Sequence, residues 1–264
     1  MRLPDYHIHT ELCGHATGAV EEYIEAAIGA SLGEIGFSDH APLPEELREG
    51  ITMPPEKTEP YIAMVQDAAG RYRDRIEVRT GFEVDFPLHS TFDSSYFSDP
   101  RLDFIIGSCH FIDGWPFDHP EFMKEFERRD IDETYGRYYA IVKDLVSSGL
   151  FNIIGHLDLV KKFGHRPTRD FTGTIGEIFK NSTNRDMAVE INTAGLRKPV
   201  AEMYPSRDII DTLFRLNVPV TLGSDSHCPG EVGHEFGSAV ELIRRAGYRK
   251  VSGFKKRKRY DIRL

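Results

Sequence analysis

Short apolar runs alternate with longer amphipathic segments along most of the chain. The short runs predict seven strands, at residues 3–8, 35–38, 76–84, 103–109, 152–155, 188–192 and 218–223. Apolar residues with helical spacing predict helices at 19–32, 58–74, 133–148, 173–184, 206–216 and 238–246. This alternation indicates βα units around a parallel sheet.

Side chains that can bind metal ions fall at or just after the ends of these predicted strands. In chain order they are His7 and His9, Asp39 and His40, Glu83 and Asp85, His110, His156 and Asp158, Asn192, and Asp225 and His227. In a parallel α/β barrel the carboxyl ends of the strands meet at one face, where the active site is built. The pattern therefore predicts that these side chains converge.

Two of the predicted connections are unusually long. Residues 41–57 contain four prolines, and residues 111–132 are aromatic and acidic. Long connections in compact domains often serve as functional lids, so we expect this role for 111–132.

Composition fits one globular domain over residues 1–264, with 40% apolar and 28% charged residues. The three cysteines, Cys13, Cys109 and Cys228, are odd in number and widely spaced, which argues against a disulfide framework and suits a reducing, cytoplasmic location. Neither a signal peptide nor a run of about 18 apolar residues is present, so no membrane association is expected.

The charge balance speaks against a nucleic-acid partner. A net charge of −9 opposes general affinity for polyanions. One basic run, Lys255 to Arg259, lies near the C-terminus, and we interpret it as solvated surface.

Histidine is the informative residue type, with eleven copies. Seven lie at or near predicted strand ends, together with Glu83 and Asp225: His7, His9, His15, His40, His110, His156 and His227. Imidazole and carboxylate ligands suit zinc, manganese or iron. A catalytic zinc takes about three protein ligands, so this set predicts two or three divalent ions, with Glu83, the only glutamate of the set, as the bridging carboxylate. Such a cluster suits hydrolysis of a phosphate ester.

Competing catalytic signatures are absent from the sequence. It contains no P-loop, no Gly-x-Gly-x-x-Gly after a strand and no Gly-x-Ser-x-Gly. Cys109 lies inside a predicted apolar strand, which favours a buried packing thiol over a nucleophile.

The motifs resemble the PHP superfamily, the polymerase and histidinol phosphatase group of metal-dependent phosphoesterases. They are Asp5-Tyr6-His7-Ile8-His9-Thr10 with His15, Ser38-Asp39-His40, Gly81-Phe82-Glu83-Val84-Asp85, Ser108-Cys109-His110, Gly155-His156-Leu157-Asp158 and Gly223-Ser224-Asp225-Ser226-His227. The resemblance implies a distorted (β/α)7 TIM-like barrel with a trinuclear centre, in which a bridging hydroxide attacks phosphorus and Glu83, Asp225 and His227 are catalytic. It implies three ligand sets: His7, His9, Glu83 and Asp225; Glu83, His110 and His156; and His15, His40 and His227.

Within this superfamily the chain is most similar to the stand-alone histidinol-phosphatases. The similarity lies in chain length, the 111–132 insertion and the segment Glu190-Ile191-Asn192-Thr193-Ala194-Gly195-Leu196-Arg197. It implies that Arg197 contacts the phosphate of L-histidinol phosphate, with Lys161 as a second candidate. A guanidinium can bind phosphate through two hydrogen bonds, although a solvated surface arginine is the plain alternative.

Several alternatives stay open from the sequence. The same centre could act on another small phosphate monoester or a nucleotide, or belong to a metal-binding domain whose catalysis has lapsed. The proton for the leaving group could come from a metal-bound water, Asp225 or Asp39. The sequence does not indicate an oligomeric state.

Overall fold

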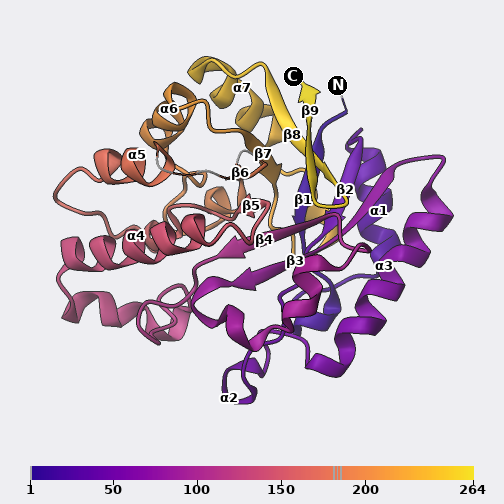
Figure 1. The fold of residues 1–264 in the computed structure, drawn as a ribbon, viewed down its shortest axis with the longest axis horizontal. Helices are drawn as coiled ribbons and strands as arrows, with labels where there is room; N and C mark the ends of the chain where they lie inside the picture. The colour runs from indigo at the N-terminus through magenta and orange to yellow at the C-terminus, as the bar shows by residue number, and fades with distance from the viewer. Residues whose placement is uncertain (1, 181, 183, 185) are drawn as a thin grey trace.

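The computed structural model describes residues 2–180, 182, 184 and 186–264, and these residues form a sheet of seven parallel strands in sequence order (Figure 1). The strands are β1 (Pro4–Ile8), β2 (Glu34–Phe37), β3 (Glu77–Asp85), β4 (Phe104–Ser108), β5 (Ile153–Ile154), β6 (Ala188–Asn192) and β7 (Val220–Gly223). A bridge between Ile8 and Ser226 nearly closes the sheet into a barrel. The seven predicted strands and the predicted α/β barrel are confirmed.

Helices surround this barrel (Figure 1). Six match the predicted segments: α1 (Val20–Gly29), α3 (Thr58–Tyr72), α4 (Ile131–Ser148), α5 (Thr172–Lys180), α6 (Arg207–Arg215) and α7 (Phe236–Ala246). The short α2 (Glu45–Arg48) lies in the proline-rich connection. The helix predicted at 173–184 runs past α5 into positions 181 and 183, which lie outside the described residues. Across the described part of the chain, no helix has the length and apolarity needed to cross a membrane.

The lower half of the barrel interior, toward the amino ends of the strands, is apolar. Its side chains are those of Tyr6, Phe104, Ile106, Ile153, Ala188 and Phe254, all buried. Because side chains alternate along a strand, Ser108 faces the same way as Ile106 in β4, and Glu190 faces the same way as Ala188 in β6. The interior therefore changes from apolar to polar toward the carboxyl ends of the strands.

A C-terminal hairpin closes the bottom of this interior. Its antiparallel strands are β8 (Lys250–Lys255) and β9 (Lys258–Arg263), and neither was predicted. Phe254 is fully buried in the apolar layer, and its backbone N–H donates to the hydroxyl of Tyr6 over 2.9 Å. This contact ties the end of the chain to its first strand.

The basic run forms the turn of this hairpin. Its lysines are exposed, as expected, but Arg257 is half-buried and donates to the carbonyls of Phe97 at 2.9 Å and Leu150 at 2.6 Å. Burial lowers the pKa of Arg257 to about 10. The interpretation as solvated surface is therefore wrong for Arg257, which fastens the hairpin to the barrel.

The 111–132 connection is packed against the barrel wall. It contains the 3-10 segment η5 (Pro120–Arg128), in which Phe126 contacts the ring of Trp115 at 4.7 Å between centroids. Phe117 is fully buried and lies 5.5 Å from the ring of Tyr138 in α4. These contacts hold the first half of the connection against η5 and α4.

Candidate metal centre

Glu83, near the end of β3, lies at the centre of the predicted ligand set. Its Oε2 is 3.2 Å from Nε2 of His7 and 3.0 Å from Nδ1 of His40. Its Oε1 is 3.0 Å from Nε2 of His156 and 3.5 Å from Nε2 of His110. The two oxygens of one carboxylate thus face two different groups of histidines.

The first group also contains His9 and Asp225. Nε2 of His9 lies 3.6 Å from Glu83 Oε2 and 3.4 Å from Asp225 Oδ1. Asp225 has a φ of 53°, a left-handed conformation that is uncommon outside glycine and marks a constrained position after β7. The chain thus brings β1, β3 and the segment after β7 to one point.

A third group of histidines lies next to His9. Ligand atoms of His15, His40 and His227 all lie within 4.8 Å of one another. The ring of His227 stacks on the rings of His9 and His15, with its centroid 4.2 Å from the first and 4.7 Å from the second. Together with the sets around Glu83, this grouping brings all nine predicted ligands into one cluster.

Cys13 is a possible donor that sequence reasoning did not place in the site. Its sulfur and one nitrogen each of His9 and His227 lie within 4.8 Å of one another. Burial raises the pKa of the Cys13 thiol to about 12, so it is protonated at neutral pH in the metal-free protein. Its position between His9 and His15 in the sequence was the available signal.

The donor set fits metal ions on observations of this structure. Nε2 of His7 and both ring nitrogens of His9 are buried without a hydrogen-bond partner, which is costly unless something else satisfies them. Burial lowers the pKa of His9 to about 3, and burial together with His9 lowers the pKa of His227 to about 2. Both rings are therefore neutral and can offer a lone pair to a metal.

The two carboxylates of the cluster are ionised. Burial opposes this state at Glu83, but His7, His40 and His110 hold its pKa well below the usual range. Burial also opposes it at Asp225, where His7 and His9 outweigh that effect and keep the pKa well below the usual range. Negative oxygens surrounded by imidazoles form a site for divalent cations.

A layer of acidic side chains orients the histidines from behind. Glu190 Oε1 is 2.6 Å from Nδ1 of His7, and its Oε2 accepts the backbone N–H of His156 at 2.8 Å. Asp85 Oδ2 is 3.0 Å from Nδ1 of His110. Such partners fix the tautomer and direction of a metal-binding ring. The role of Glu190 was missed, although a carboxylate inside the apolar run of β6 was a visible signal.

Arg197 lies at the edge of the cluster, in the 3-10 segment after β6. Its Nη2 donates to the carbonyls of Ser224 at 2.8 Å and Asp225 at 3.2 Å, and its Nε is 3.1 Å from Glu231 Oε1. Nη1 is buried and has no hydrogen-bond partner. The surface-arginine alternative does not hold, because the side chain is 19% exposed and anchored beside Asp225.

Lys161 is placed differently from the expectation. Its ammonium lies 2.8 Å from Asp158 Oδ2 and 2.9 Å from Glu202 Oε2, and it donates to the carbonyl of Met203 at 2.8 Å. The residue is 1% exposed. A phosphate contact would require this ammonium to exchange one of its three partners.

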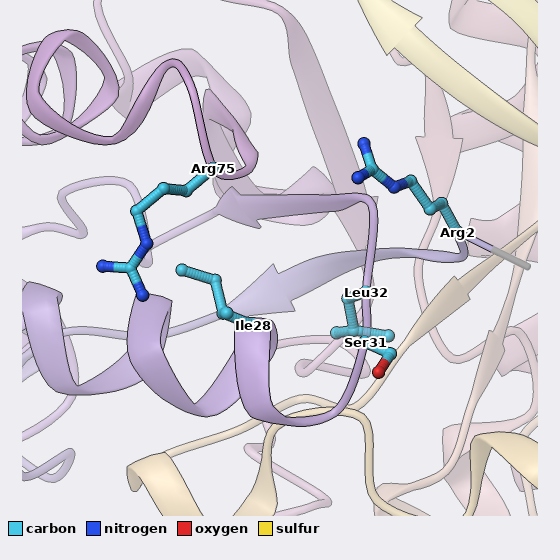
Figure 2. Close-up of a pocket in the computed structure, with 5 residues that line it drawn as sticks. All are labelled: Arg2, Ile28, Ser31, Leu32 and Arg75. Carbon is cyan, nitrogen blue, oxygen red and sulfur yellow. The ribbon is translucent and has the colours of Figure 1, made fainter.

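A hollow of about 340 Å³ lies away from the histidine cluster, where α1 ends and β1 begins (Figure 2). Arg2 and Arg75 flank it, with Ile28, Ser31 and Leu32 between them. Arg75 is already paired with Glu25, with its Nη2 2.7 Å from Oε2. This hollow contains none of the predicted site residues.

Active sites of parallel barrels lie at the carboxyl ends of the strands, and a cluster of histidines and carboxylates there can hold metal ions that activate water for hydrolysis. The model of the PHP domain family matches residues 5–194, which include β2 to β6 and all but the first residue of β1. The chain belongs to this family.

Known proteins are similar to this chain over nearly its whole length. A protein of Deinococcus radiodurans named probable histidinol-phosphatase is 43% identical, over 97% of this chain and 98% of its own length. The histidinol-phosphatase of Bacillus subtilis is 28% identical, over 91% of this chain and 99% of its own. The structure of histidinol phosphate phosphatase from Lactococcus lactis, complexed with zinc, L-histidinol and phosphate, matches with a TM-score of 0.81 at 24% identity, covering 98% and 99% of the two chains.

Proposed function

We propose that this protein hydrolyses L-histidinol phosphate to L-histidinol and inorganic phosphate. The observation that carries the reaction is Glu83, whose two oxygens face two groups of histidines and can join neighbouring cations. The substrate is supported by the relatives named histidinol-phosphatase, one of them 43% identical over nearly the full length of both chains.

The proposed metal ligands are the nine residues predicted from the sequence: His7, His9, His15, His40, Glu83, His110, His156, Asp225 and His227. Their grouping supports two or three divalent ions of zinc, manganese or iron, and the zinc of the Lactococcus lactis enzyme supports the first of these. When bound, the ions supply Lewis acidity toward the phosphoryl oxygens and activate water. Glu83, Asp225 and His227 are the proposed catalytic residues, because they would hold the ions that polarise the phosphoryl group.

Arg197 is the protein side chain that we propose to bind the phosphate of the substrate. Its Nη2 and Nε are anchored by Ser224, Asp225 and Glu231, so the guanidinium is held in one orientation. The unpartnered Nη1 can then donate to a phosphate oxygen, an interaction strengthened by charge. Lys161 remains a second candidate, through exchange of its internal partners.

Two aspartates considered as proton donors take different roles in this proposal. Burial opposes ionisation of Asp225, but His7 and His9 hold its pKa well below the usual range, so we assign it as a ligand and not as an acid. Asp39 is fully buried, accepts a hydrogen bond from Thr10 and lies 3.6 Å from Nδ1 of His9. We assign Asp39 to orienting His9.

A substrate panel tests the proposal. Protein loaded with Zn²⁺ or Mn²⁺ should release phosphate from L-histidinol phosphate much faster than from sugar phosphates or nucleotides, measured as kcat/KM for each. Metal content should be quantified on the same samples, and chelation should abolish the activity. Equal rates across the panel would reject histidinol phosphate as the substrate, and no hydrolysis by the fully loaded protein would indicate lapsed catalysis.

A further inference from the structure

We infer that Asp118, with the hydroxyl of Tyr204, forms the subsite that binds the ammonium group of the substrate. This inference rests on the proposed function, because L-histidinol phosphate carries an ammonium on the carbon next to its phosphorylated carbon. A cation so close to the phosphoryl group must lie within the same site as the metal cluster. The wall of that site therefore needs a carboxylate that the metal centre does not use.

Asp118 lies on the side of the cluster formed by His110 and His156. The residue before it, Phe117, packs on Tyr138, whose hydroxyl donates to the carbonyl of His156 at 3.5 Å. Its own Oδ2 accepts from Nζ of Lys162 at 3.0 Å, and Lys162 follows η6 (Leu159–Lys161), shortly after His156. Asp118 is thus fixed to the barrel wall from two directions.

Electrostatics agree with this position. Burial opposes ionisation of Asp118, but Lys162 and then His110 and His156 lower its pKa below the usual value. Asp118 is therefore a carboxylate whose charge acts on two predicted metal ligands. Its side chain is 20% exposed, so the carboxylate is not sealed inside the protein.

The other carboxylates near the cluster are engaged by the protein. Their partners are His110 for Asp85, His7 for Glu190, Thr10 for Asp39, Lys161 for Asp158 and Glu202, and Arg197 for Glu231. Asp118 differs in its exposure: within the described ranges its Oδ1 has no hydrogen-bond partner and belongs to a side chain that is 20% exposed, whereas the unpartnered Oδ1 atoms of Asp39 and Asp158 are buried. One oxygen of a charged group is thus free beside the site.

Tyr204 supplies a second polar atom on this side. Its ring lies 6.4 Å from that of His156, and its buried hydroxyl has no hydrogen-bond partner. Burial raises the pKa of Tyr204, and so do the carboxylates of Asp158, Asp225 and Asp118. The hydroxyl thus lies on the His156 side of the cluster without a partner in the protein, and an ammonium placed beside it would be stabilised by a hydrogen bond and by the neighbouring carboxylates.

The experiment compares two substrates that differ only in the ammonium group, L-histidinol phosphate and its deamino analogue, imidazolylpropyl phosphate. Asp118→Asn should raise KM for histidinol phosphate by about tenfold to a hundredfold, the loss of a hydrogen bond to a charged group, with little change for the analogue. Tyr204→Phe should act in the same direction by about two- to tenfold. Calorimetric binding of L-histidinol in the presence of inorganic phosphate should weaken by similar factors.

Controls separate binding from support of the chain. Asp113→Asn changes an exposed carboxylate of the same connection that pairs with Arg137, and it should affect neither substrate. Lys162→Met removes the cation beside Asp118 and should tighten the binding of L-histidinol, because the carboxylate is then less neutralised. If Asp118→Asn weakens both substrates equally, or if Lys162→Met reproduces its effect, Asp118 only supports the connection and the inference is wrong.

The two proposals fail in distinguishable ways. A wild-type protein that does not prefer histidinol phosphate over other monoesters would reject the proposed function and this subsite together. A wild-type protein with that preference, whose Asp118→Asn variant treats the two substrates like the wild type, would reject the subsite alone.

Discussion

The chemistry of the cluster depends on which groups carry charge. Glu83 and Asp225 are ionised, whereas His9 and His227 are held neutral by burial and by neighbouring rings. Metal binding requires deprotonated ligands, so these four residues are in the correct state before any ion arrives. Arg197 has a different proposed role, because it is a cation anchored beside Asp225 and not a metal ligand.

Substitution should separate these two roles. His9→Ala should lose metal and activity together, because His9 contacts both carboxylates of the first group. Arg197→Met should keep its metal and lose about tenfold to a hundredfold in kcat/KM, the value of a charge-assisted hydrogen bond. Metal analysis and steady-state kinetics on both variants check this. Full activity in either variant would contradict the assignment of that residue.

At the scale of elements, the strand ends were predictable and the supporting layers were not. Polar residues interrupt apolar runs after each predicted strand, and parallel strands necessarily bring these positions together. The partners of Lys161 could not be predicted, because Glu202 and Met203 come from a connection whose path depends on packing. The C-terminal hairpin was missed because exposed lysines dominate its sequence, among which the buried Phe254 and the half-buried Arg257 give no regular pattern.

Close packing of β6 against β7 gives a test of how rigidly the strands position the ligands. A Cβ added at Gly223 would lie 1.9 Å from Glu190 Oε1 and 2.8 Å from Cβ of His7. Gly223→Ala should therefore cost about 1–3 kcal/mol in unfolding free energy and weaken metal binding, since His7 must move. Chemical denaturation and equilibrium dialysis measure the two effects.

Gly70→Ala is the matched control. Gly70 lies in α3 with no atom within 4 Å of the added Cβ, so the substitution should raise stability by about 0.5–1 kcal/mol through helix propensity. Metal binding should not change. Equal behaviour of the two alanine variants would show that Glu190 and His7 can readily move aside.

At the scale of the whole molecule, the barrel has two ends with opposite tasks. The carboxyl ends of the strands carry the polar cluster, and the amino ends are sealed by the hairpin β8–β9 through Phe254. Stability and chemistry are thus placed at opposite ends of one interior, as is usual for barrels of this kind.

Removing the Phe254 side chain, through which the hairpin covers the amino ends of the strands, should reduce stability and leave the metal centre intact. Phe254→Ala removes a fully buried ring from the lower layer and should cost about 3–5 kcal/mol. Lys258→Ala, an exposed change on the same hairpin, should stay within about 0.5 kcal/mol of the wild type. Urea unfolding measures both, and kcat per bound metal below the transition should match the wild type. A loss of kcat in the folded Phe254→Ala protein would show that the two ends are coupled.

The closure of the barrel between β1 and the segment after β7 has a mechanical consequence. His9 N donates to Ser226 O at 3.0 Å and Ser226 N donates to His7 O at 3.1 Å, so the seam passes between the predicted ligands of the first ion. An ion held by His7, His9 and Asp225 would therefore add a cross-link between β1 and the segment after β7, at the point where the barrel closes. Loss of metal would then remove this cross-link and the proposed activity at the same time.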